Sequence, residues 1–371
     1  MSALKRVLVI CTLAVAVTLT PSAGTTTLTE TAPGWIKTGG REDPPNALYD
    51  QCTTEDETFT IGSCMLPQEC DLLGGTASGD CAQGLGTCCI VKASCNSEAT
   101  LNNTYFVNEE IVPGACTLVV HKSSENICQI RLDFKEFHIS QPDSNGHCVD
   151  DFMIIATESG SNIPTICGNN NGQHMYVDLA PFGEVVEIIV DIALPNPSTA
   201  WKIQVSQIPC NSMDKAPDGC LQYHTETVGV VKGFNFDSQV DSRVTRQIAH
   251  QNYGVCVKKA QGYCGIIWTR DIEAGPYTFT VSGDDGALFP DLIGTPEASA
   301  VGAECPRDYV IILEGVSDYG EQADRYCGLG FPNIVMSTAA PFVLYVRTDG
   351  EESIDGGNQG FMLHYRQTTT C

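Results

Sequence analysis

Two short stretches of the sequence place an aspartate at the same distance from a cysteine. They read HCVDDFMII at 147–155 and ECPRDYVII at 304–312, and each runs on into an aromatic residue and a hydrophobic segment. The carboxylates of Asp151 and Asp308 could contribute to a site for a hard cation such as calcium, which takes six or more oxygen ligands. They could equally accept hydrogen bonds from backbone N–H groups in the turn after the cysteine. The shared spacing indicates one structural unit that is used twice.

Residues arranged for catalysis are not evident. The sequence contains neither a Gly-Asp-Ser-Gly-Gly nucleophile loop nor a His-Glu-x-x-His helix motif. The seven histidines are scattered over predicted strands and turns, and His250 in IAHQN has no serine motif to accompany it. The sequence therefore predicts a protein that is not an enzyme.

The N-terminus has the pattern of a secretory signal peptide. Lys5 and Arg6 precede an apolar run from Val7 to Leu19, and the small residues of SAG (22–24) follow. This apolar run is too short to span a bilayer, and no later stretch offers about 18 uninterrupted apolar residues. We assign residues 1–23 to the signal peptide and expect a secreted, extracellular protein without a membrane span.

The mature chain is strongly acidic. Without Lys5 and Arg6 it carries 18 basic and 45 acidic residues, a net charge of −27. This charge repels phosphate backbones and anionic membranes, so nucleic acid is not an expected partner. Cations and basic protein surfaces are better candidates, although the same charge also keeps a secreted protein soluble.

Cysteine use agrees with export. One of the 19 cysteines, Cys11, lies in the signal peptide, and none of the remaining 18 is spaced Cys-x-x-Cys. An even number of cysteines in an oxidising compartment predicts disulfides rather than zinc ligands. Residues 24–51, which precede the first of them, are rich in Thr, Pro and Gly and are expected to form a flexible tether.

Six cysteines crowd into residues 52–89. So short a segment cannot bury enough apolar surface to fold on its own core, and three disulfides would compensate. Cys88 and Cys89 are neighbours and should pair with different partners. The order of the six, ending in GTCC, resembles the clip domain of arthropod secreted proteins. This resemblance implies the pairs Cys52–Cys88, Cys64–Cys81 and Cys70–Cys89.

The other twelve cysteines divide into two sets of six, at 95–210 and 220–371. CVDDFMIIA aligns with CPRDYVIIL, ICG with YCG, and AWKIQVSQ with GFMLHYRQ, always in the same order. Matched motifs in matched order predict an internal repeat. Within the repeats, CQIRLDF alternates apolar and polar residues, while VVEIIVDI (185–192) and PFVLYVRT (341–348) are more continuously apolar. Several short strands per repeat predict an all-β protein built from two antiparallel two-sheet sandwiches.

These motifs resemble the CUB domain. A cysteine is followed by Cys-x-x-Asp-aromatic with a hydrophobic strand, then by Cys-Gly and a Gly-aromatic strand. ICQIRLDF, ICGNNNGQHMYVD, WKIQVSQIPC and YGVCVKKAQGYC are similar to arthropod secreted CUB proteins with a cysteine-rich N-terminal segment. The resemblance implies tandem CUB-like sandwiches of the jelly-roll type. It also implies the disulfides Cys148–Cys167 and Cys305–Cys327.

The remaining cysteines are paired from local geometry. Cys116 and Cys128, and likewise Cys256 and Cys264, could face each other across a hairpin. That choice leaves Cys95–Cys210 and Cys220–Cys371 to close each repeat near its ends. A CUB domain with four cysteines would pair its first two, so Cys95–Cys116 is the alternative.

The CUB resemblance also implies a calcium site that uses the aspartate of Cys-x-x-Asp. In the second repeat, Asp308 would be joined by Asp349 in RTDGEESIDGG and by Asp284 or Asp285 in SGDDG. In the first repeat, Asp151 has Gln141 where an acid is expected. Calcium is therefore predicted for the second repeat before the first.

Two surface features complete the list of sites. Asn102 opens an Asn-Asn-Thr glycosylation sequon in a predicted loop. The expanded stretch 282–304 is expected to present apolar residues to a partner or to fold back over a sheet edge. Its apolar residues are Leu288, Phe289, Leu292 and Ile293.

Taken together, these patterns predict a secreted, disulfide-rich protein whose CUB-like repeats bind another extracellular protein in adhesion or scaffolding. The clip-like segment motivates an alternative role, as a non-catalytic cofactor or inhibitor of an extracellular protease cascade.

Overall fold

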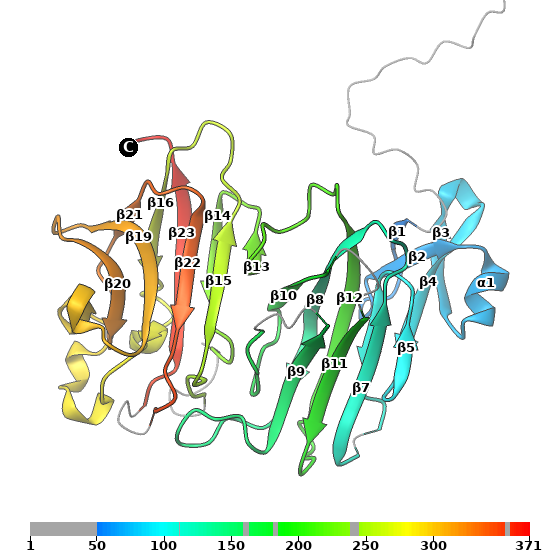
Figure 1. The fold of residues 1–371 in the computed structure, drawn as a ribbon, viewed down its shortest axis with the longest axis horizontal. Helices are drawn as coiled ribbons and strands as arrows, with labels where there is room; N and C mark the ends of the chain where they lie inside the picture. The colour runs from blue at the N-terminus through cyan, green and yellow to red at the C-terminus, as the bar shows by residue number, and fades with distance from the viewer. Residues whose placement is uncertain (1–49, 111, 159–162, 181–184, 238–244, 353–356) are drawn as a thin grey trace, which may run out of the picture. The chain divides into compact units, whose positions relative to one another are not determined.

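The computed structural model describes residues 50–110, 112–158, 163–180, 185–237, 245–352 and 357–371 (Figure 1). All of them belong to one compact unit. The predicted signal peptide and nearly all of the predicted tether lie outside the described residues. The tether ends earlier than expected, because the Asp50 carbonyl already accepts a hydrogen bond from the Cys64 amide at 2.8 Å. Within the described residues, no helix has the length and apolar character needed to cross a membrane.

The six-cysteine segment folds into a small sheet with one short helix. Its elements are β1 (Gln51–Thr53), β2 (Ile61–Met65), α1 (Pro67–Leu72), β3 (Thr76–Cys81), the 3-10 helix η1 (Ala82–Gly84) and β4 (Gly86–Ala93). Its disulfides are Cys52–Cys88, Cys64–Cys81 and Cys70–Cys89, the same pairs that the clip resemblance implies. All six cysteines are buried, so sulfur provides much of the interior of a segment too small for an ordinary core.

The first repeat is a two-sheet sandwich. Its strands are β5 (Ser97–Ala99), β6 (Thr104–Val107), β7 (Gly114–His121), β8 (Ile127–His138), β9 (Asp151–Thr157), β10 (His174–Asp178), β11 (Val185–Ile192) and β12 (Ala200–Pro209). One sheet has the order β5-β7-β11-β9. The other runs β1-β2-β4-β6-β12-β8-β10, so the six-cysteine segment and the first repeat share a sheet. On β8 the predicted alternation holds from Ile130 to Phe134, where the apolar residues are buried and Arg131 and Asp133 half-buried, but Gln129 is also buried.

The second repeat has more strands. They are β13 (Cys220–His224), β14 (Val228–Lys232), β15 (Asn252–Val257), β16 (Gly265–Arg270), β17 (Phe279–Thr280), β18 (Ser299–Val301), β19 (Tyr309–Ser317), β20 (Gln322–Gly328), β21 (Val335–Ser337), β22 (Phe342–Arg347) and β23 (Gly360–Thr368). The strand path is β13-β15-β22-β19-β21-β16-β23-β14. The first residues of β19 pair with β22 and its last residues pair with β21, so the path passes from one layer to the other along β19. Short 3-10 helices lie at η2 (Pro276–Thr278), η3 (Asp285–Ala287), η4 (Pro290–Leu292), η5 (Pro296–Ala298) and η6 (Gly302–Glu304).

The prediction of an all-β fold is confirmed, with one difference in strand direction. Three pairs are parallel, namely β4 with β6, β5 with β7, and β13 with β15. Parallel neighbours need a crossover between them. Here β5 is the crossover between β4 and β6, β6 between β5 and β7, and β14 between β13 and β15. β5 and β6 lie in different sheets, and β14 lies at the opposite end of the strand path from β13.

Four of the predicted disulfides are wrong. Cys116–Cys128 and Cys256–Cys264 do not form, and neither do Cys95–Cys210 and Cys220–Cys371. The pairs present are Cys95–Cys116, Cys128–Cys210, Cys220–Cys256 and Cys264–Cys371.

The hairpin assumption failed because β7 and β8 lie in different sheets. In the second repeat β15 and β16 likewise have no direct pairing and bond to different neighbours. The true partners follow strand register instead. Cys128 on β8 reaches Cys210 because β8 pairs with β12, and β16 pairs with β23 between Cys264 and Cys371.

The remaining pairs, Cys148–Cys167 and Cys305–Cys327, are those that the CUB resemblance implies. With them, both repeats pair their six cysteines in the same order: first with second, third with sixth, fourth with fifth. This common order is a structural counterpart of the matched sequence motifs.

Candidate interaction surface

Asp151, the first of the two aspartates singled out by spacing, holds loops together. It is buried at the start of β9. One carboxylate oxygen accepts from the Ser140 amide at 2.9 Å and from the Ser140 hydroxyl at 2.6 Å. The other accepts from the Ala193 amide at 3.0 Å. Both oxygens thus connect the start of β9 to the loops after β8 and β11. This is the turn-holding role.

Asp308 occupies the equivalent buried position before β19. Its carboxylate accepts a hydrogen bond from the Asp349 amide at 2.6 Å. The Asp349 carboxylate accepts from the Glu351 amide at 2.8 Å, and Asp284 caps η3 through the Gly286 amide at 2.9 Å. In the ranges that the structure describes, no three His, Cys, Asp or Glu side chains are grouped to hold a metal. A calcium site formed by Asp308, Asp349 and Asp284 stays a prediction, and we derive no calcium-dependent step.

Loops at one end of the first repeat are engaged by the second. Gln141 and Asn235 exchange two side-chain hydrogen bonds, at 2.8 and 3.0 Å. Arg246 donates to the Pro142 carbonyl at 2.8 Å. His147 lies within 3.1 Å of the Gly350 carbonyl and stacks on His250 with ring centroids 5.5 Å apart. The polar groups of the loop at 141–147 are thus used in contacts with the second repeat.

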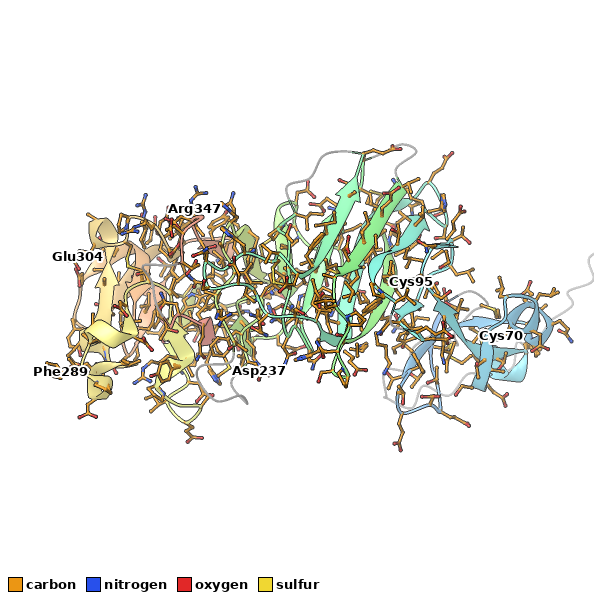
Figure 2. All side chains as sticks on the ribbon, turned by 90° about the horizontal axis from the view of Figure 1, so that it is seen from below. Cys70, Cys95, Asp237, Phe289, Glu304 and Arg347 are labelled. Carbon is orange, nitrogen blue, oxygen red and sulfur yellow. A yellow bond between two sulfur atoms is a disulfide. The ribbon has the colours of Figure 1, made fainter. Side chains whose placement is uncertain are left out.

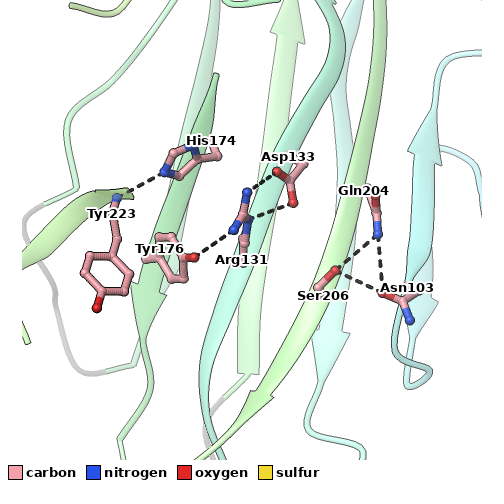
Figure 3. A network of polar contacts seen from close by, with 8 residues as sticks. All are labelled: Asn103, Arg131, Asp133, His174, Tyr176, Gln204, Ser206 and Tyr223. Carbon is pink, nitrogen blue, oxygen red and sulfur yellow. Dashed lines mark hydrogen bonds and ion pairs between the residues drawn. The ribbon is translucent and has the colours of Figure 1, made fainter. Parts of the chain in front are cut away.

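A second contact joins β10 to β13 (Figure 3). Arg131 makes two hydrogen bonds to Asp133 and a third to the Tyr176 hydroxyl. On the same strand as Tyr176, the His174 ring nitrogen Nε2 accepts from the Tyr223 amide at 3.0 Å. Burial lowers the pKa of His174 to about 3, and the positive charge of Arg131 adds to this effect. A neutral His174 is what this contact requires, because a protonated Nε2 could not accept the hydrogen bond.

Neighbouring His224 has a similar environment. Its ring lies 5.1 Å from that of His174, and burial together with Arg131 lowers its pKa to about 4. The junction between the repeats therefore contains two imidazoles held in the neutral form.

The turn between β5 and β6, at Asn102 and Asn103, connects the first repeat to the six-cysteine segment. Asn103 accepts from Ser206 at 3.0 Å and from Gln204 at 3.3 Å (Figure 3). The Asn102 carbonyl accepts from the Ser63 hydroxyl at 2.9 Å, and its side-chain oxygen accepts from the Gln207 amide. Asn102 is half-buried rather than exposed. Glycosylation of Asn102 stays a prediction.

The loop from 282 to 304 is ordered and presents one large apolar side chain. Phe289 is 79% exposed, whereas Ile293 is buried and Leu288 and Leu292 are half-buried. The loop is held to the segment after β20, because the Gly294 amide donates a hydrogen bond to the Leu329 carbonyl at 2.6 Å. Of the four residues predicted to form an interaction surface, Ile293 is therefore excluded by its burial and Phe289 is the most exposed, while binding of a partner by this loop stays a prediction. Figure 2 shows Phe289 and Glu304 at the same end of the second repeat.

A groove of ≈ 270 Å³ lies elsewhere on the second repeat. Its lining includes Cys220, Tyr223, Lys258, Lys259, Phe342 and Tyr345. Both lysines are exposed, and the Lys259 ammonium lies 5.6 Å from the centre of the Phe342 ring. The sequence analysis missed this site. Two adjacent lysines in so acidic a chain were its only signal, since the aromatic residues come from strands far apart in sequence.

Comparison with known proteins identifies part of the chain. Residues 217–368 match the family model of the animal CUB domain, so the second repeat contains a CUB domain. The CUB1-EGF-CUB2 domains of rat MASP-1 align with 73% of this chain and 100% of theirs, at 12% identity and a TM-score of 0.25. The CUB1-EGF-CUB2 domain of human MASP-1/3 aligns with 71% and 98%, at 14% identity and the same TM-score. These two alignments carry no argument here. No curated protein matches the chain.

Proposed function

We propose that this protein is a secreted, non-enzymatic adhesion or scaffolding protein that binds an extracellular partner through the Phe289 loop, residues 282–304. The CUB domain at 217–368 supports an extracellular interaction module. The nine disulfides among the described residues support an oxidising compartment. The observation that carries the proposal is an aromatic side chain, 79% exposed, on an ordered loop.

The chemistry of the loop indicates what it would bind. Aromatic residues that enter a pocket of the partner supply much of the energy of an interface. Five acidic residues lie around Phe289 in the sequence, and no lysine or arginine occurs from 281 to 306. The acidic residues are Asp284, Asp285, Asp291, Glu297 and Glu304. A basic surface with an apolar pocket is therefore the complementary partner, with the charges mainly accelerating association.

A pull-down from extracellular fluid tests this assignment. The wild-type protein should retain a partner that Phe289→Asp loses by more than about tenfold, because the aromatic anchor is removed. Leu194→Asp is the matched control, since Leu194 is also 79% exposed but lies in the first repeat. Equal recovery by wild type and Phe289→Asp, with unchanged melting temperatures, would remove the loop from the interaction.

The six-cysteine segment supports a second candidate, the regulation of a protease cascade without catalysis. Its three disulfides have the order that the clip resemblance implies. The purified protein should then change the rate of an extracellular protease reaction in stoichiometric amounts. A protein lacking residues 50–93 would not be a clean comparison, because β4 shares a sheet with β6. The exposed Leu72→Asp variant in α1 is the suitable probe, and an unaltered protease rate with wild type would reject this role.

A further inference from the structure

We propose that the partner of the Phe289 loop includes a second copy of this protein, whose lysine groove receives the loop, so that copies join head to tail. The lysine groove is the ≈ 270 Å³ groove that contains Lys258 and Lys259. This inference rests on the proposed function, because it names a binding partner for the same loop.

The lysine groove has the chemistry that the loop lacks. Its apolar part includes the Cys220–Cys256 disulfide together with Tyr223, Phe342 and the half-exposed Tyr345. Lys258 and Lys259 add two exposed positive charges to it.

One acid lines the groove within the part of the chain that the structure describes. It is Asp218, which is engaged by the Lys215 ammonium at 2.7 Å. Lys258 and Lys259 thus form a locally basic site beside Tyr345 on a chain with a net charge of −25. Such a groove favours an acidic segment that carries an aromatic side chain.

The Phe289 loop is a segment of that kind. Phe289 is the N-cap residue of η4, and both it and Asp291, two residues further on, are exposed. Packing a phenylalanine ring against the exposed Tyr345, which lies beside the buried Tyr223 and Phe342, gives most of the attraction, since exposed ion pairs add little on their own. The lysines would select an acidic loop over a neutral one and keep the two acidic bodies from repelling each other at the point of contact.

The positions of the two features determine the kind of assembly. The lysine groove is built at β13, β15 and β22, the first three strands of the sheet path. The Phe289 loop contains β18, which pairs with β20, a strand that branches from β19 off this path. Since β22 and β19 lie between them, the loop and the groove are at different ends of the second repeat, and the loop would reach the groove of another molecule (Figure 1). A contact between two different surfaces leaves one of each free at the ends of the assembly. Unless the rotation between copies closes a ring, further copies can add and form an open chain.

Sedimentation velocity of the purified full-length protein provides the test. The contact is small, so we expect weak association with a Kd on the order of 100 μM. The average mass of wild type should rise between about 10 μM and about 1 mM and pass beyond that of a dimer. Phe289→Ala and Lys259→Glu should each remain monomeric. Leu194→Ala and Lys135→Glu, exposed controls in the first repeat, should behave as wild type.

Mixing the two defective variants gives the decisive result. Phe289→Ala retains an intact groove and Lys259→Glu an intact loop, so the mixture should form a dimer and nothing larger. A monomeric wild type at 1 mM would overturn the inference, as would a wild-type dimer that both variants leave unchanged. If wild type stays monomeric while Phe289→Asp still loses a partner in the pull-down, the inference fails and the proposed function stands. If the pull-down also shows no difference, both fail.

Discussion

The two repeats share their cysteine pairing and their Cys-x-x-Asp turn, and they differ in what their surfaces contact. In the first repeat, β6 pairs with β4 of the six-cysteine segment, and β10 contacts β13 of the second repeat. Its loop at 140–147 is also bonded to the second repeat. The second repeat has the 282–304 insertion and the lysine groove in addition to these contacts. The first repeat therefore acts as a joint between the six-cysteine segment and the second repeat, while the second repeat retains exposed surfaces.

This difference shows how one scaffold can be used twice. A sandwich needs its core strands and disulfides in both copies, because these determine whether it folds. Its end loops are less constrained, and they can be used for internal contacts or for partners. The buried aspartate illustrates the point, since Asp151 binds the loops on either side of it while Asp308 lies beside the acidic stretch 349–352.

The largest effect should come from removing the aspartate that anchors the joint. Asp151→Ala leaves the amides of Ser140 and Ala193 without their acceptor and should lower the free energy of unfolding by about 3 kcal/mol, measured by urea denaturation. Asp150→Ala is the control, because this neighbour is exposed. Equal stability of the two variants would show that the first repeat does not depend on this anchor.

The joint should also weaken in acid. The pKa values of His174 and His224 are about 3 and about 4 in the folded chain, below the ordinary value of 6.5. The unfolded chain therefore binds more protons below pH 6.5, and stability is lost as the pH falls from 6.5 towards these folded pKa values. We expect a loss of about 3 kcal/mol between pH 7 and pH 5 from the two groups.

Substitution identifies the source of this acid sensitivity. His174→Gln keeps an acceptor for the Tyr223 amide but cannot be protonated in this range, so it should remove about half of the loss. His138→Gln, on β8, should leave the loss unchanged. Urea denaturation at both pH values measures it, and identical pH dependence in wild type and His174→Gln would mean that the joint is not the acid-sensitive part.

Calcium should have the smallest effect of the three. Because the described residues show no group of carboxylates around Asp308, 10 mM calcium should raise the free energy of unfolding by no more than about 1.4 kcal/mol relative to chelator, the gain from a Kd of about 1 mM. Melting curves measure this difference. A gain above about 2 kcal/mol that Asp308→Asn removes and Asp151→Asn retains would establish the calcium site that the sequence predicts for the second repeat.

Much of the architecture is encoded locally and could be read without a structure. Alternation in CQIRLDF and the apolar run at 185–192 correspond to β8 and β11, because side-chain period and burial are linked along a single strand. The matched order of motifs likewise predicted the repeat. Residues 304–312 showed where the second aspartate would be buried.

Tertiary structure decided the features that depend on which strands become neighbours. Cys116 and Cys128 are close in sequence, yet their strands enter different sheets and each cysteine bonds elsewhere. Chain separation does not determine register between distant strands, so the sequence alone could not settle these pairs. The lysine groove arises in the same way, from residues near 220, 258 and 342 that only the folded sheet brings together. The sequence by itself determined the strands, the cysteine content and the acidic charge, while the packing of the two layers decided which residues form the joint and which form the exposed surfaces.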